Sequence, residues 1–226
     1  PAASAPASPA LVSAASAQTI RSSLDRDALS RPIRAVGFDV EYATVHEGGD
    51  RFPALIQVAV PDAVLLLWID KFRKRGAAPP EALVELMDNP AIVKLGVGIG
   101  GDVVALCKFW DGHNPNDARE RFKGIVDLNR YIRFRNMQYL IPTDGSPGFT
   151  LADLSEMVLK RRMAKIKSTA VTAKASHWRA ERMSPRMKSY AAQDAAAALA
   201  IFETLEAARD RDPSRAADDD EELVVG

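Results

Sequence analysis

The sequence has almost no cysteine and no long apolar run. Cys107 is the only cysteine among 226 residues, so no internal disulfide can form, and this usage is typical of a reducing compartment. The longest apolar stretches, such as residues 63–69, have the length of a strand rather than of a membrane span. We therefore expect a soluble intracellular protein without membrane contact, and its compartment stays open between nucleus, cytoplasm and an organelle such as the mitochondrion.

The chain also lacks net charge, because Lys plus Arg and Asp plus Glu both number 30. The charges are nevertheless distributed unevenly. Residues 151–190 contain ten Lys or Arg against three acids, whereas residues 210–222 contain seven acids against two Arg. This pattern predicts a basic working face and an acidic tail.

Composition divides the chain into three parts. Residues 1–30 are rich in Ala, Ser and Pro, and their first acid is Asp25, so we expect a flexible segment, either a disordered linker or the remnant of an organellar targeting sequence. Residues 31–208 are long and apolar enough for one globular domain. Residues 209–226 form the acidic tail, which we expect to be disordered.

Apolar periodicity and turn residues predict an α/β fold built on a mixed sheet flanked by helices. An antiparallel meander is expected at residues 33–41, 54–60 and 63–69, and parallel strands at 92–97 and 125–128. The expected helices cover residues 81–87, a segment that opens at Asp102, residues from a Thr150 cap to about 162, and residues 185–208. Residues 163–184 are basic and weakly periodic, which indicates a loop or short helices on the surface.

Two acids occupy one face of the first predicted strand. Asp39 and Glu41 alternate with apolar residues, so both carboxylates lie on the same side and repel by a few kcal/mol at an effective dielectric of about 20. A polar face turned to solvent would also accommodate them. We otherwise expect a cation between them.

The last predicted helix carries a third acid within its packing stripe. Three- and four-residue spacing places Tyr190 and Asp194 on the face that contacts the domain, and the surrounding alanines permit a close approach to the sheet. Asp194 could instead pair with an Arg, Tyr190 could be a core aromatic with a satisfied hydroxyl, and Asp102 could be a helix N-cap.

Taken together, four motifs resemble those of the DEDDy 3′-to-5′ exonucleases, in particular the ribonuclease D and Werner-syndrome exonuclease branch. They are Phe38-Asp39-Val40-Glu41, Ala54-Leu55-Ile56-Gln57, Gly96-Val97-Gly98-Ile99 with Gly101-Asp102, and Tyr190-Ala191-Ala192-Gln193-Asp194-Ala195. The resemblance spans residues 35–205. The sister subclass carries a His where this chain has Ser189, and the family usually has a Gln where this chain has Met187.

The resemblance implies a ribonuclease-H-like fold and a two-metal mechanism with Mg²⁺ or Mn²⁺. Asp39 would bridge the ions, Glu41 and Asp194 would complete one site, and Asp102 would hold the other directly or through water. Tyr190 would orient the attacking water, since its ordinary pKa near 10 makes it a poor base. The expected reaction removes nucleoside 5′-monophosphates from the 3′ ends of single-stranded DNA or RNA.

Six basic residues could follow the substrate backbone, although a solvated surface is the alternative: Arg161, Arg162, Lys165, Lys167, Lys174 and Arg179. Trp178 is expected to pack, and His46, His113 and His177 show no ligand spacing. Protein partners could contact the acidic tail or the unmatched loops 111–123 and 135–148.

Two other functions remain open from sequence alone. One is a binding or structural subunit of a larger nucleic-acid complex that keeps the fold with little or no activity. The other is an endonuclease of the wider fold that cuts RNA/DNA hybrids. Internal cuts, as opposed to stepwise loss of mononucleotides, would identify the endonuclease.

Overall fold

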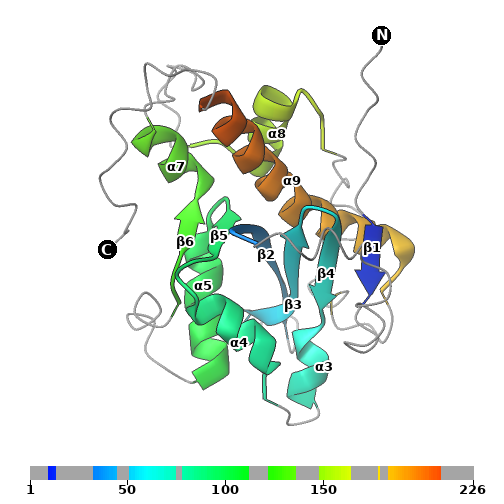
Figure 1. Ribbon diagram of the computed structural model, residues 1–226. Helices are drawn as coiled ribbons and strands as arrows, with labels where there is room; N and C mark the ends of the chain where they lie inside the picture. Colours follow the sequence, from blue (N-terminus) through cyan, green and yellow to red (C-terminus); the bar gives the residue numbers. More distant parts are fainter. Residues whose placement is uncertain are drawn as a thin grey trace.

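The computed structural model describes residues 10–13, 33–44, 51–74, 78–111, 122–135, 148–163, 178 and 183–209. Its centre is a six-stranded sheet of order β1-β4-β3-β2-β5-β6 (Figure 1). The strands are β1 (Ala10–Ser13), β2 (Ala35–Thr44), β3 (Arg51–Val60), β4 (Ala63–Leu67), β5 (Val93–Gly96) and β6 (Ile125–Asp127). The helices are α3 (Ile69–Lys74), α4 (Glu81–Asp88), α5 (Ile99–Asp111), α7 (Leu128–Phe134), α8 (Leu151–Leu159) and α9 (Pro185–Arg209).

The sheet confirms the predicted mixture of strand directions. β2, β3 and β4 form the antiparallel meander, because β3 pairs antiparallel with both neighbours. β5 then pairs parallel with β2, and β6 pairs parallel with β5. β1 adds a parallel edge beside β4, a strand that the composition of residues 1–30 did not predict.

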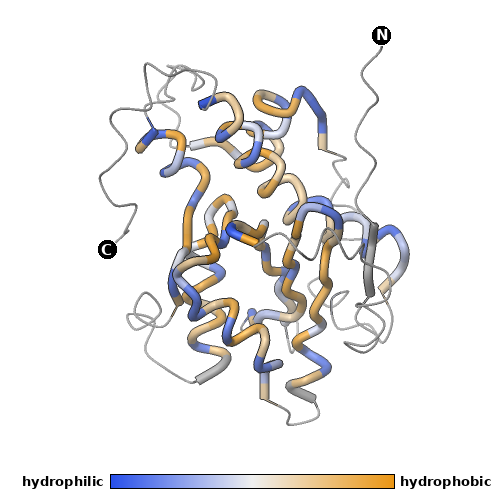
Figure 2. Tube along the Cα trace, viewed as in Figure 1, coloured by the Kyte–Doolittle hydropathy of each residue, from blue (hydrophilic) through white to orange (hydrophobic). Residues whose placement is uncertain are grey.

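Helices cover both faces of the sheet and bury a separate core on each. On one face, α4 and α5 pack with Val36, Phe38 and Val40 of β2. On the other face, α9 crosses β2, β3, β4 and β5, and α8 packs against α9. Figure 2 shows the central strands largely in orange, the colour of apolar residues, as expected for a sheet covered on both sides. None of the described helices has the length and apolar character that crossing a bilayer requires.

Several predicted boundaries were wrong. Helix α5 begins at Ile99 rather than at Asp102, because within the expected bend at residues 98–101 only Gly98 adopts a positive φ, of 72°. The N–H of Gly98 donates to Asp127 at 2.6 Å. Helix α8 ends at Leu159 instead of residue 162, since Lys160 takes the left-handed conformation. The meander strand predicted to reach residue 69 stops at Leu67.

Two short helices were absent from the prediction. α3 begins at Ile69, where an apolar run had indicated strand. α7 directly follows β6, and its N-cap is Asp127, whose side chain accepts from the N–H groups of Asn129 and Arg130. A helix of one or two turns offers little periodicity, so such elements depend on their caps and on tertiary packing.

Candidate active site

Strand β2 carries two acids on the face that α9 covers. Asp39 and Glu41 are half-buried there, while the alternating residues face the opposite core. Asp39 lies opposite Gln57 of β3, and Glu41 lies opposite Leu55. The register shifts directly after Glu41, as at a β-bulge, and the pairing of β2 with β3 then continues to Thr44.

Helix α9 brings the third acid to this strand. Its residues Ala191, Ala195 and Ala198 are buried against the sheet. At Gly37 the approach is so close that a Cβ atom would lie 1.8 Å from the carbonyl oxygen of Ala195. Only glycine fits there, and the contact places Asp194, the residue before Ala195, over β2.

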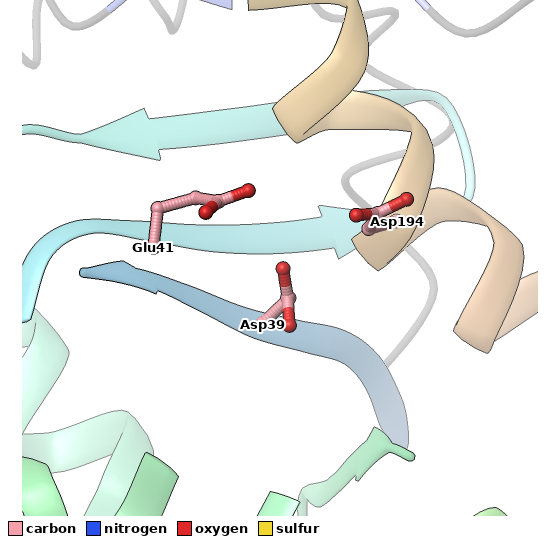
Figure 3. Close-up of side chains that lie close together, drawn as sticks. All are labelled: Asp39, Glu41 and Asp194. Carbon is pink, nitrogen blue, oxygen red and sulfur yellow. The ribbon is translucent and has the colours of Figure 1, made fainter. Parts of the chain in front are cut away.

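The structure gathers Asp39, Glu41 and Asp194 into one cluster. One carboxylate oxygen from each residue lies within 4.8 Å of the others. Figure 3 shows the two side chains of β2 and that of α9 directed into the same space. The periodicity that placed Asp194 on the packing face of its helix therefore led to the correct neighbours.

The carboxylates of this cluster hold protons more tightly than ordinary acids. Burial raises the pKa of Asp39 to about 6, and burial followed by the charge of Asp39 raises the pKa of Asp194 to about 7. Burial and the other acids raise the pKa of Glu41 to about 8, against a lowering by Arg51. These shifts follow from crowding like charges in a partly desolvated site.

Among the described residues, no Lys or Arg forms an ion pair with any of these acids. The guanidinium of Arg51 instead lies over the ring of Tyr42, 4.9 Å from its centroid. The ion pair considered for Asp194 is therefore not formed within the described part of the chain. Besides protonation, a bound divalent cation neutralises such a group of carboxylate oxygens.

Asp102 lies near the cluster and accepts a hydrogen bond from a tyrosine. It lies in the first turn of α5, which begins three residues earlier, so it is neither the residue that opens the helix nor its N-cap. The hydroxyl of Tyr42 donates to its Oδ1 at 2.7 Å. Burial raises the pKa of Asp102 to about 7, and its charge in turn raises that of Glu41. Asp102 is thus close enough to act on the cluster electrostatically, although it is not one of the three grouped acids.

Tyr190 lies one turn before Asp194 on α9, close enough for the two side chains to act on each other electrostatically. Burial, and then the charge of Asp194, raise the pKa of Tyr190 to about 12. Its hydroxyl is therefore protonated at neutral pH and can serve as a hydrogen-bond donor. It cannot remove a proton from water under these conditions.

A cavity of about 350 Å³ opens beside Asp39 and Asp194. Its other walls are the end of β5, at Gly96 and Val97, and the segment from Gly148 to Leu151 that leads into α8. Asn129 fixes this segment: its amide donates to the carbonyl oxygen of Phe149 at 3.0 Å, and its Oδ1 accepts from the N–H of Phe149 at 2.8 Å. Thr150 and Asp153 form the capping box of α8, which confirms the predicted Thr150 cap.

A family model described as 3′-5′ exonuclease matches residues 16–208 of this sequence. The chain belongs to this exonuclease family. The resemblance found in the four motifs is thereby confirmed.

Two curated relatives can be aligned with this sequence over about three quarters of its length. Human exonuclease 3′-5′ domain-containing protein 2 is 28% identical over 168 residues, which are 74% of this chain and 24% of the human protein. The mouse bifunctional 3′-5′ exonuclease/ATP-dependent helicase WRN is 28% identical over 172 residues, 75% of this chain and 11% of that protein. The chain thus spans about a quarter of the length of the first relative and less of the second.

Solved structures confirm the ribonuclease-H-like exonuclease fold. The exonuclease domain of Aedes aegypti Nibbler superposes with a TM-score of 0.61 at 20% identity, over 89% of this chain and 88% of that one. Brucella melitensis NrnC gives a TM-score of 0.57 at 16% identity, over 82% of this chain and 78% of that one. At these identities the likeness concerns the arrangement of the sheet and helices.

The family motif at residues 54–57 contains one buried polar residue to which the sequence assigned no role. Gln57 has 0% of its surface exposed, and neither Oε1 nor Nε2 has a hydrogen-bond partner in the described part of the exonuclease fold. An unsatisfied buried polar group costs about 1–3 kcal/mol. The sequence could not reveal this state, because it depends on what α9 and the neighbouring strands bring to the position.

The basic residues expected to bind nucleic acid are only partly described. Arg161 and Arg162 are exposed after α8, and Nε of Arg162 pairs with Glu156 at 3.0 Å. Lys165, Lys167, Lys174 and Arg179 lie outside the described residues, as do the three histidines, the acidic tail and most of both unmatched loops. Trp178 packs as expected: it is buried, and its carbonyl oxygen accepts from Nε1 of Trp68 at 2.8 Å.

Proposed function

We propose that this protein is a metal-dependent 3′-to-5′ exonuclease. It hydrolyses the terminal phosphodiester of single-stranded nucleic acid and releases nucleoside 5′-monophosphates. The observation that carries this proposal is the grouping of Asp39, Glu41 and Asp194 within 4.8 Å, without a described Lys or Arg to neutralise them. Membership of the 3′-5′ exonuclease family supports it.

The donor set fits a hard divalent cation such as Mg²⁺ or Mn²⁺, which prefers carboxylate oxygens. Asp39, Glu41 and Asp194 would hold one cation, and Asp39 with Asp102 would hold a second, directly or through water. Bound there, the metal supplies a hydroxide nucleophile at neutral pH and stabilises the negative charge of the leaving 3′ oxygen. Among structures of similar fold, Brucella melitensis NrnC has been solved with Mg²⁺ and also with pGG.

The protein's own side chains position the reactants. The hydroxyl of Tyr190 stays protonated beside Asp194 and would orient a water near the cluster. The cavity beside Asp39 has a volume of about 350 Å³, within the range of small-ligand sites, and would hold the terminal nucleotide. A base can enter such a cavity only when it is unpaired, which favours single-stranded ends.

A 5′-labelled single strand of DNA or RNA, incubated with Mg²⁺ or Mn²⁺, tests this function. The wild type should shorten the strand in single-nucleotide steps from its 3′ end, and chelation of the metal should stop the reaction. Asp39→Asn should abolish shortening. Asp62→Asn, which changes an exposed acid in the β3–β4 turn, is the matched control and should retain it.

The products also separate the two other functions. Internal cuts in an RNA/DNA hybrid would identify an endonuclease. An intact 3′ end with every metal, together with equal strand binding by wild type and Asp39→Asn, would identify a binding subunit and contradict the enzyme.

A further inference from the structure

Gln57 lies next to Asp39 on the face of the sheet that α9 covers. The two residues are direct partners in the antiparallel register of β2 and β3. Side chains of directly opposed residues leave the same face, with Cβ atoms about 4.5–5.5 Å apart. The amide of a glutamine can bridge that separation to a carboxylate.

Within the sheet, the neighbours of Gln57 on this face other than Asp39 have no side chain that could form a hydrogen bond with it. Its partner on β4 is Leu66, and the residues two positions away along β3 are Leu55 and Ala59. All three are buried members of the core that α9 completes. Asp39 is therefore the polar side chain that the strand register places within reach of the amide.

We propose that Gln57 is the positioning residue of Asp39, and that its Nε2 donates a hydrogen bond to the Asp39 carboxylate when that carboxylate holds a divalent cation. The inference rests on the proposed function, whose central acid it concerns. An amide suits this task because it orients a carboxylate without neutralising it. A Lys or Arg at the same position would form an ion pair and compete with the cation for the charge of Asp39.

Neither atom of the Gln57 amide has a hydrogen-bond partner among the described residues, so the amide does not stabilise this fold by hydrogen bonding. A contact with the metal-loaded Asp39 carboxylate would explain why the residue is polar. A purely structural role would be filled by leucine or methionine, which bury the same volume without a polar group. Residues that orient a metal ligand typically change metal affinity or activity by about 10–100-fold when they are substituted. The same substitution should leave the metal-free fold intact.

Gln57→Met tests the proposal, because it removes the amide and retains the length of the side chain. Two quantities should be measured: the dissociation constant for Mn²⁺, by calorimetry or electron paramagnetic resonance, and the unfolding temperature without metal. We expect Mn²⁺ binding to weaken by about 10–100-fold and the metal-free unfolding temperature to stay the same or rise. Leu66→Met is the matched control in the same core and should bind Mn²⁺ like the wild type.

The results that would overturn the role of Gln57 differ from those that would overturn the proposed exonuclease function. Unchanged Mn²⁺ affinity in Gln57→Met would overturn the proposal. A lower unfolding temperature without metal, or failure to fold, would also overturn it, because the amide would then stabilise the fold itself. If the wild type binds Mn²⁺ but leaves 3′ ends intact, the proposed exonuclease function fails, whereas the role of Gln57 is still decided by the change in affinity.

Discussion

The carbonyl oxygen of Ala195 in α9 occupies the space that a side chain on Gly37 of β2 would need. A Cβ atom built on Gly37 would lie 1.8 Å from that oxygen and 2.8 Å from its carbonyl carbon. This contact brings the helix backbone down onto the strand that carries Asp39. The geometry of the acidic cluster therefore depends on a glycine two residues away from the first acid.

Gly37→Ala should separate α9 from the sheet. The added Cβ would meet backbone atoms of α9, so no change of rotamer can relieve the clash. We expect a loss of about 3 kcal/mol in the free energy of unfolding, measured by chemical denaturation. Gly101→Ala is the control, since nothing lies within 4 Å of its Cβ position in α5. That substitution should be neutral or stabilising by up to about 1 kcal/mol. Equal stabilities of the two variants would contradict this packing.

Without metal, the free energy of unfolding should fall as pH rises from 5 to 8. The folded protein raises the pKa of Asp39 to about 6, of Asp102 and Asp194 to about 7, and of Glu41 to about 8. It therefore holds protons that the unfolded chain releases near pH 4, and the stability that they confer is lost as pH rises through the folded values.

Denaturation of the chelator-treated protein at several pH values measures this slope. Asp39→Asn should flatten it, because one of the repelling charges is removed. Saturating Mg²⁺ should restore more stability at pH 8 than at pH 5, since binding requires ionised carboxylates. A metal-free stability that increases from pH 5 to 8, with the same slope in Asp39→Asn, would show that the cluster is not strained by its own charge.

Tyr190→Phe should separate orientation of the water from metal binding. Because the Tyr190 hydroxyl stays protonated at neutral pH, we do not expect it to be a metal ligand, and Mn²⁺ affinity should change little. Loss of the orienting donor should lower kcat by about 10²-fold, with KM nearly unchanged. Steady-state kinetics on a single-stranded oligonucleotide provide both parameters. Full activity combined with lower stability would instead assign Tyr190 to packing.

The exposed pair Arg161 and Arg162 should contribute to the salt dependence of strand binding. Each phosphate contact accounts for about 0.7 in the slope of log affinity against log salt for a single strand. Replacing both by alanine in an Asp194→Asn background, which prevents cleavage, should therefore reduce the slope by about 1.4. Arg34→Ala changes another exposed arginine and serves as the control. An unchanged slope would assign the pair to a solvated surface.

Much of the site could be predicted from sequence because its acids interrupt regular patterns. Asp39 and Glu41 break an apolar alternation, and Asp194 breaks a helical stripe, so each stands out where a charge is costly. The mixed sheet was predictable because its strands and helices follow those regular apolar patterns. Periodicity is a local signal, and these three residues are anomalies within it.

The remaining features depend on contacts between distant segments. The hydrogen bond from Tyr42 to Asp102 joins residues 60 positions apart, and no spacing rule indicates it. Asn129 is likewise unremarkable in sequence, although it fixes the segment around Phe149 that lines the cavity. The helix containing Asn129 was missed because it is held by its cap at Asp127 rather than by a long amphipathic pattern.

Anomalous scattering from manganese in crystals of the wild-type protein tests the central claim most directly, because it locates the ions without reference to activity. We predict a peak in contact with Asp39, Glu41 and Asp194, and its loss in crystals of Asp39→Asn. A crystal grown in saturating Mn²⁺ without a peak at these three carboxylates, or with manganese bound only by other residues, would contradict the account.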